Sequence, residues 1–243
     1  MEKGLQLTCS NTGTVDEPYR EVLGSLMYVM TSTRPDICFP VGYLGQFQQE
    51  PEQLHWTAQK RVVRYMKGTK DMFLEFSRGK DVEPLVGFID SDWATDTVDR
   101  KSVSRFLFQV YGNTVSWSSK KQTTVATSSS EAEYVALSAG VTEAIWLTGL
   151  LGDLGVKITK PIPIYEDNRV CIGMAQNLEC KRAKHIDIKH HFIRDHIAAG
   201  RIRVEHVRTE HQLADIFTKV LDVGRFEDLR RIIGLHNREG VKK

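Results

Sequence analysis

The chain has 243 residues, enough for one large domain or for one domain with an appended segment. Hydrophobic residues make up 41% and charged residues 26% of the chain, which excludes a disordered, collagen-like or coiled-coil protein. The 33 Lys and Arg residues nearly balance the 31 Asp and Glu residues, so the net charge of +2 does not by itself indicate a partner.

The sequence predicts a protein that is not secreted. Its four cysteines have neither the CxxC spacing of a metal site nor the density of a disulfide scaffold, and we expect them to be reduced thiols. The first residues lack the apolar core of a signal peptide. No uninterrupted apolar run approaches the ~20 residues that a membrane span needs. We therefore expect a cytoplasmic or nuclear protein without a membrane partner.

The first ~80 residues are expected to be mostly helical. Apolar residues recur at three-residue and one-residue steps over 19–30, which is typical of an amphipathic helix. The segment 34–36 interrupts the pattern because its central proline cannot continue a helix. A second helix is expected over 54–66, closed by Gly68, and residues 72–76 alternate as a short strand does.

After residue 84 the pattern changes to alternating strands and helices. Residues 85–89 form a nearly continuous apolar run, which favours a buried strand. Two further expected strands, 106–111 and 114–117, flank a Gly-Asn dipeptide that is typical of a hairpin. A long helix with one apolar face is then expected to begin at Ser130 and to end near residue 154.

The rest of the chain continues the alternation. The expected elements are a strand, two helices, a strand and two short helices, over 161–165, 168–176, 186–199, 202–207, 213–217 and 226–233. This order predicts an α/β fold with a mixed sheet flanked by helices. Basic residues gather in two stretches, 100–121 and 181–208. Their positive field suits a polyanion, although a solvated surface has the same composition.

Four acidic residues lie where strands end or helices begin. They are Asp90, Glu133, Asp167 and Asp215. If these ends meet at one edge of the sheet, the like charges raise one another's pKa values, and divalent cations remove that penalty. Oxygen ligands without Cys or paired His favour Mg²⁺ or Mn²⁺ over zinc. Each acid also has a structural interpretation, such as a capping box between Ser130 and Glu133.

Six sequence blocks occur in a characteristic order. They are GFIDSDWA (87–94), RKS (100–102), SSSEAEY (128–134), YEDN (165–168), KHIDI (184–188) and QLADIFTK (212–219). Together they resemble the ribonuclease H domain of copia-type retrotransposon Pol polyproteins. Residues 18–77 are similar to the segment that joins the reverse transcriptase of that family to its nuclease. The polymerase motif Tyr-x-Asp-Asp does not occur.

The resemblance implies three parts. Residues 1–80 would be a mostly helical connection segment of reverse-transcriptase origin, without a polymerase active site. Residues 81–222 would form a ribonuclease H-like domain with a mixed five-stranded sheet, followed by a C-terminal helix and tail over 223–243. The implied partners are an RNA·DNA hybrid and the reverse transcriptase portion of the parent polyprotein, located in the nucleus or in a cytoplasmic virus-like particle. No small-molecule cofactor is implied.

The resemblance also implies two-metal hydrolysis of the RNA strand of the hybrid. Two Mg²⁺ ions, for which Mn²⁺ can substitute, would activate water and stabilise the leaving oxygen. The implied catalytic and metal-binding residues are Asp90, Glu133, Asp167 and Asp215. Asp92 remains an alternative to Asp90, because the two share one face of an extended strand. Glu131 is likewise the alternative to Glu133.

Side chains near these acids are candidates for contacts with the hybrid. Four residues have hydroxyl or amide groups that can form hydrogen bonds with the 2′-hydroxyls of RNA: Ser128, Ser129, Ser130 and Asn168. The same residues can equally cap helices. Candidate phosphate contacts are Lys120, Lys121, Arg182 and Lys184. Trp93 and Trp117 are expected to be core or sheet-face aromatics rather than platforms on which bases stack.

Three positions depart from the family pattern. Arg105 stands at a usual glycine, Arg169 at a usual glutamine and Val220 at a usual proline. Arg169 adds charge and bulk beside Asp167. This raises the alternative of an inactive, retrotransposon-derived remnant that still binds nucleic acid. A third alternative, a nuclease or integrase of the same fold that acts on DNA, is disfavoured because its zinc-binding module is missing.

Overall fold

The computed structural model describes residues 7, 13–78, 82–93, 100–176 and 184–237. The chain divides into two compact units. One unit comprises residues 77–218, and the other combines residues 1–76 with residues 219–243. The sequence predicts boundaries after residues 80 and 222, with a C-terminal helix and tail over 223–243. In the structure this C-terminal segment forms one unit with the N-terminal segment.

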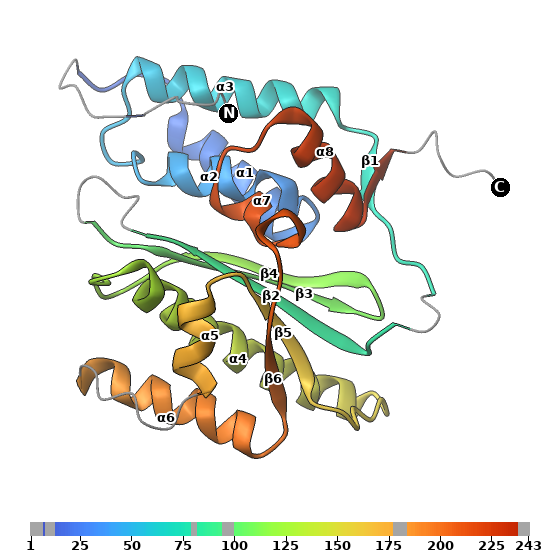
Figure 1. The fold of residues 1–243 in the computed structure, drawn as a ribbon. Helices are drawn as coiled ribbons and strands as arrows, with labels where there is room; N and C mark the ends of the chain where they lie inside the picture. The colour runs from blue at the N-terminus through green and yellow to red at the C-terminus, as the bar shows by residue number, and fades with distance from the viewer. Residues whose placement is uncertain (1–6, 8–12, 79–81, 94–99, 177–183, 238–243) are drawn as a thin grey trace. The chain divides into compact units, whose positions relative to one another are not determined.

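The unit 77–218 is built on a five-stranded sheet with the order β4-β3-β2-β5-β6 (Figure 1). Its strands are β2 (Leu85–Asp92), β3 (Val103–Val110), β4 (Asn113–Lys121), β5 (Ile162–Glu166) and β6 (Ile202–His206). The first three pair antiparallel, whereas β5 pairs parallel with both β2 and β6. The expected α/β class with a mixed five-stranded sheet is confirmed.

Helices flank this sheet. They are α4 (Ser129–Asp153), α5 (Arg169–Gln176), α6 (Lys184–Ala198), the 3₁₀ turn η2 (Thr209–His211) and the short α7 (Asp215–Thr218). The helix α4 packs against β2 and β3 and contacts both α5 and α6. By length and composition alone α4 could cross a membrane, but its buried residues form the centre of the core of this unit.

A glycine lets α4 lie close to β2. A Cβ atom added at Gly140 would stand only 2.1 Å from Cδ1 of Ile89, and both residues lie in the core. Since Ile89 directly precedes Asp90, this contact brings the buried face of α4 against the strand segment that carries the first acid.

The other unit is mostly helical, as expected for its N-terminal part. Its elements are α1 (Tyr19–Ser32), η1 (Pro35–Ile37), α2 (Cys38–Gly45), α3 (Gln53–Gly68), β1 (Met72–Leu74), α8 (Val223–Ile232) and β7 (Leu235–Asn237). β1 and β7 pair antiparallel, with Phe73 opposite His236. A strand that follows the N-terminal helices is therefore hydrogen-bonded to a strand near the end of the chain within this unit.

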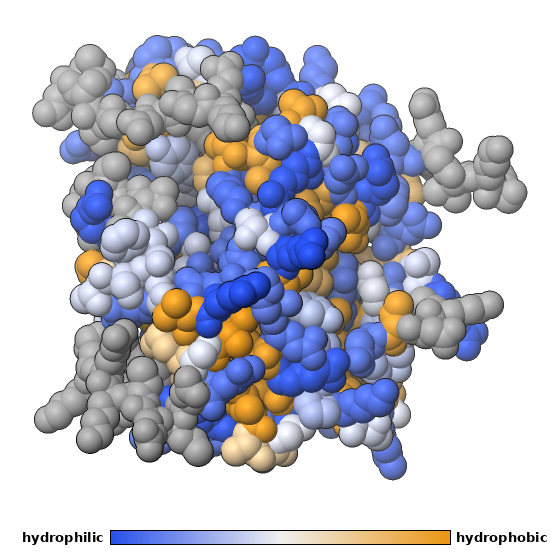
Figure 2. All heavy atoms as spheres, viewed as in Figure 1, coloured by the Kyte–Doolittle hydropathy of each residue, from blue (hydrophilic) through white to orange (hydrophobic). Residues whose placement is uncertain are grey.

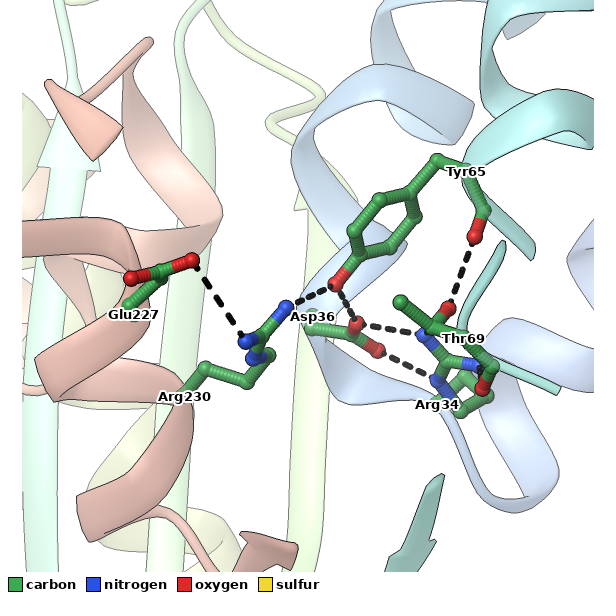
Figure 3. A network of polar contacts seen from close by, with 6 residues as sticks. All are labelled: Arg34, Asp36, Tyr65, Thr69, Glu227 and Arg230. Carbon is green, nitrogen blue, oxygen red and sulfur yellow. Dashed lines mark hydrogen bonds and ion pairs between the residues drawn. The ribbon is translucent and has the colours of Figure 1, made fainter. Parts of the chain in front are cut away.

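A polar network joins the same segments (Figure 3). The guanidinium of Arg34 donates two hydrogen bonds, of 2.9 and 2.8 Å, to the carboxylate of Asp36, and also donates to Thr69. The hydroxyl of Tyr65 donates to Asp36 (2.6 Å) and accepts from Arg230 of α8 (3.0 Å). Burial, assisted by the Asp36 charge, raises the pKa of Tyr65 to about 12, so the phenol stays protonated.

On the face of the molecule drawn in Figure 2, hydrophobic residues lie interspersed among hydrophilic ones. Large apolar side chains with substantial exposure include Tyr28, Trp93 and Trp146. Single exposed apolar residues are common on globular proteins, so only those placed beside functional groups call for an explanation.

Candidate metal centre

Three of the four expected acids come together at one edge of the sheet. Asp90, Glu133 and Asp167 each offer a carboxylate oxygen, and these oxygens lie within 4.8 Å of one another. Phe88 of β2 is paired with Tyr165 of β5, so Asp90 and Asp167, each two residues further on, lie level and on the same face. Glu133 reaches this edge from the beginning of α4.

The fourth acid, Asp215, lies near this group but is not one of the three. It is fully buried at the start of α7. Burial raises the pKa of Asp90 to about 7, and the charge of Asp215 is the next largest cause. The structure therefore places Asp215 beside Asp90.

The segment that carries Asp215 is fixed to both neighbouring strands. The buried Gln212 donates a hydrogen bond from Nε2 to the carbonyl oxygen of Ile89, at 2.8 Å. Thr209 donates from Oγ1 to Oδ2 of Asp167, at 2.9 Å. These two contacts hold the chain after β6 against the residue that precedes Asp90 and against Asp167 itself.

The contacts of Asp92 distinguish it from Asp90. One carboxylate oxygen of Asp92 accepts a hydrogen bond of 2.8 Å from Nη1 of Arg105. The other accepts a hydrogen bond of 2.7 Å from the amide of Val103. Both carboxylate oxygens are thus engaged away from the acidic group. Arg105 also donates to Ser119, and its side chain is only 5% exposed. The guanidinium is occupied by Asp92, which leaves Asp90 facing Glu133 and Asp167.

The first turn of α4 similarly separates Glu131 from Glu133. The helix begins one residue earlier than expected, and its cap is Ser128, whose Oγ accepts from the amide of Glu131. The carboxylate of Glu131 accepts from the amide and the hydroxyl of Thr127. The alternative of a capping box between Ser130 and Glu133 is therefore wrong, and the carboxylate of Glu133 is not used in capping.

Glu166 is a further buried acid that the sequence reasoning missed. It ends β5 and is fully buried, and its Oε1 accepts from the amide of Asn168 at 3.1 Å. Burial raises its pKa well above the ordinary range. Glu133 also has a strongly raised pKa, caused by burial and then by the Glu166 charge. Strand alternation places Glu166 on the opposite face from Asp167, a signal that could have identified it as a buried acid.

Among the described residues, Oε2 of Glu133 and Oε2 of Glu166 are buried carboxylate oxygens without a hydrogen-bond partner. A buried charged oxygen without a partner is costly, and its acid either keeps a proton or binds a cation. The orphaned oxygen of Glu133 fits a ligand for a hard divalent cation.

The residues expected to contact nucleic acid differ in their positions and exposure. Asn168 caps α5, because its Oδ1 accepts from the amides of Val170 (3.0 Å) and Cys171 (3.1 Å). Ser128, Ser129, Lys120 and Lys121 are exposed, and Ser130 is half-buried. In the sheet register Lys121 lies opposite Val103, which is itself opposite Asp92, so the lysines share the edge of the acidic group. Arg182 and the side chain of Lys184 lie outside the described residues.

The structure places two side chains that the sequence interpretation singled out outside the core. Trp93, expected in the core or on a sheet face, is 53% exposed just after β2. Arg169 begins α5 with an exposed side chain. The physical reason in both cases is position, because each residue follows the end of a strand, where the chain leaves the sheet. Trp117 is half-buried in β4, opposite Leu107, as expected for a sheet-face aromatic.

Curated polyproteins of plant transposons are similar to most of the chain, whereas no family model matches it. The chain is 38% identical over 221 residues to the retrovirus-related Pol polyprotein from transposon TNT 1-94 of Nicotiana tabacum. These residues cover 90% of the chain and 16% of that protein. The chain is 39% identical over 218 residues to the polyprotein from transposon RE2 of Arabidopsis thaliana, covering 89% of the chain and 15% of that protein. The chain thus spans about a sixth of these relatives.

A shorter relative and two solved structures complete the comparison. Secreted RxLR effector protein 161 of Plasmopara viticola is 50% identical over 131 residues, which cover 54% of the chain and 92% of that protein. LC11-RNase H1, isolated from compost, has a TM-score of 0.43 at 17% identity and covers 56% of this chain and 93% of its own. A foamy viral protease-reverse transcriptase has a TM-score of 0.45 at 14% identity, and the match covers 83% of this chain and 33% of that one.

Proposed function

Because the chain belongs to the retrovirus-related Pol polyproteins of copia-type transposons, as a C-terminal part, we propose that it is a metal-dependent ribonuclease H. It would hydrolyse the RNA strand of an RNA·DNA hybrid. One observation carries this proposal. Three elements distant in sequence, β2, α4 and the end of β5, bring carboxylate oxygens of Asp90, Glu133 and Asp167 within 4.8 Å of one another.

The chemistry of this group fits divalent cations. Its ligand atoms are carboxylate oxygens, which Mg²⁺ and Mn²⁺ prefer. Asp90 and Glu133 are buried, and burial raises the pKa of both; the charge of Asp215 adds to the shift of Asp90 and the charge of Glu166 to that of Glu133. Bound cations would supply the positive charge that activates a water molecule and stabilises the leaving oxygen. Asp90, Glu133 and Asp167 would hold these cations, with Asp215 as a further ligand.

The protein's own residues position these ligands. Thr209 orients the carboxylate of Asp167, and Gln212 holds the segment of Asp215 beside β2. Arg105 forms an ion pair with Asp92, so the carboxylate of Asp92 is not available as a further metal ligand. This arrangement pre-organises the site, since its ligands are held by neighbouring contacts before a cation arrives.

The surroundings support a polyanionic substrate. Lys120 and Lys121 are exposed at the edge of the sheet where the acids lie, and they would contact phosphates without selecting a sequence. We infer the hybrid and the reverse transcriptase portion of the parent polyprotein as partners. The location that fits them is a virus-like particle in the cytoplasm, or the nucleus.

The test is cleavage of a labelled RNA strand within an RNA·DNA duplex in the presence of Mg²⁺. Single-stranded RNA and double-stranded DNA serve as substrate controls. We expect cleavage of the hybrid RNA alone, and a loss of at least about a hundredfold in Asp90→Asn. Asp153→Asn is the matched control, because Asp153 is an exposed acid at the end of α4. It should cleave as the unmodified protein does.

The same assay separates the proposal from the two alternatives. A folded protein that binds the hybrid but does not cleave it would be an inactive remnant. Preferential cleavage of double-stranded DNA would indicate another nuclease of this fold. The structure does not favour the remnant, because Arg105 is paired with Asp92 and Arg169 is exposed, so neither blocks the acidic group.

A further inference from the structure

An exposed aromatic side chain lies beside the acidic group. Trp93 directly follows β2, three residues after Asp90, and it is 53% exposed. Tryptophan is usually buried over much of its surface, because its indole removes a large apolar area from water. An indole that remains exposed next to a candidate catalytic site therefore calls for an explanation.

The indole is fixed in place rather than free. Its Nε1–H donates a hydrogen bond of 3.2 Å to the carbonyl oxygen of Ala126, a buried residue of the loop between β4 and α4. The next residue of that loop, Thr127, is held by the carboxylate of Glu131. This contact uses the one polar group of the indole and leaves its apolar faces for a ligand.

The placement suits a nucleic acid. Trp93 follows the end of β2 that carries Asp90, and its partner Ala126 belongs to the loop that leads into α4, which carries Glu133. The indole therefore lies at the edge of the sheet to which Asp90 and Glu133 belong. Val125, in the same loop, adds an apolar side chain that is 50% exposed.

We propose that Trp93 is a substrate-binding residue that packs its indole against a nucleotide of the bound hybrid. This inference rests on the proposed function and assigns one subsite of it. Aromatic side chains bind nucleotides regardless of sequence, because every base has a flat apolar face. A hydrogen-bonded indole binds with little loss of conformational freedom, since its orientation is already set.

The test measures affinity for a hybrid in the Asp90→Asn background, which prevents turnover. Trp93→Ala should raise the Kd about tenfold. Trp93→Phe keeps an aromatic ring without the Nε1–H group and should show a smaller increase. The matched control is Trp146→Ala, because Trp146 is a 59% exposed tryptophan of α4 and should leave the Kd unchanged. Melting temperatures of all variants verify the fold.

A second measurement separates direct contact from a structural effect. Hybrids with a single abasic nucleotide, placed in turn along each strand, are bound by the proteins with and without Trp93. At the nucleotide that contacts the indole, the abasic change should weaken binding by the Trp93 protein. It should have no further effect on Trp93→Ala, because both changes remove the same contact.

The outcomes distinguish this inference from the function on which it rests. If the unmodified protein cleaves the hybrid while Trp93→Ala binds within twofold of its parent, the inference is wrong and the function stands. If the abasic effect is the same with and without Trp93 at every position, the inference is also wrong. If the unmodified protein neither binds nor cleaves the hybrid, the proposed function itself fails.

Discussion

The ion pair between Asp92 and Arg105 is buried, with side chains 10% and 5% exposed, and lies two residues from Asp90. A buried ion pair is weak evidence for stability as a whole. Removing one partner is nevertheless costly, because it leaves an uncompensated charge in a site from which water is excluded. Arg105, which departs from the family pattern, thus has a defined role in holding Asp92.

Arg105→Ala is expected to lower the free energy of unfolding by about 3 kcal/mol. The measurement is urea denaturation. Arg208→Ala is the control, because its ion pair with Glu210 is 3.5 Å long and exposed, and should contribute at most about 1 kcal/mol. Equal effects of the two substitutions would contradict the role assigned to Arg105.

Buried carboxyl groups also predict how stability depends on pH. Burial and the charge of Asp215 raise the pKa of Asp90 from an ordinary 3.8 to about 7, and the pKa values of Glu133 and Glu166 are raised further. The folded protein therefore retains protons that the unfolded chain releases near pH 4. Without metal, the free energy of unfolding should fall between pH 4 and 7, by up to about 1.4 kcal/mol per pH unit for each proton.

The measurement is the melting temperature against pH in EDTA and in Mg²⁺. Mg²⁺ should offset the loss above pH 7, by about 2.7 kcal/mol at a hundred times its Kd. Glu166→Gln should flatten the dependence measured in EDTA, because it removes one of the retained protons. Stability that rises between pH 4 and 7 in EDTA would contradict the placement of these acids.

At the scale of elements, the close approach of α4 to β2 depends on Gly140, which has no side chain. Gly140→Ala should destabilise the protein by about 1–2 kcal/mol, because its Cβ would lie 2.1 Å from Ile89. Gly149→Ala, in the same helix, should stabilise it by up to about 1 kcal/mol, since nothing lies within 4 Å and alanine favours helix. Thermal denaturation compares the two, and effects of the same sign would contradict the packing.

Sequence periodicity predicts the long elements well because one face of each is buried. The strand alternation and the apolar face of α4 predicted the central sheet and its main helix. The short α2 (Cys38–Gly45) was missed because its own residues are apolar or glycine, so no polar face marks a helical period. β7 was missed because it has three residues and its partner β1 (Met72–Leu74) lies far from it in the sequence.

The acidic group was only partly predictable for a similar reason. Strand ends and helix starts favoured Asp90, Glu133 and Asp167, but spacing alone could not separate Asp90 from Asp92. That choice depends on Arg105, which pairs with Asp92 from another strand. Trp93 was assigned to the core or a sheet face because composition does not reveal that the chain leaves the sheet after Asp92.

At the scale of the whole molecule, the chain's two ends belong to one unit. β7 pairs with β1, and Arg230 of α8 donates to Tyr65 of α3. A chain that ends at residue 218 should lose amide-exchange protection in α3 and β1, whereas the strands of unit 77–218 should keep theirs. A chain that ends at residue 237 is the control. Unchanged protection in α3 and β1 after the shorter truncation would contradict this division.

The most direct test of the central claim is binding of Mn²⁺, followed by electron paramagnetic resonance. The account predicts that the unmodified protein binds Mn²⁺, that Mg²⁺ competes, and that Asp90→Asn, Glu133→Gln and Asp167→Asn each weaken binding at least tenfold. Asp153→Asn should bind as the unmodified protein does, because this exposed acid is not part of the group. Binding that is unaffected by all three substitutions would contradict a metal centre at Asp90, Glu133 and Asp167.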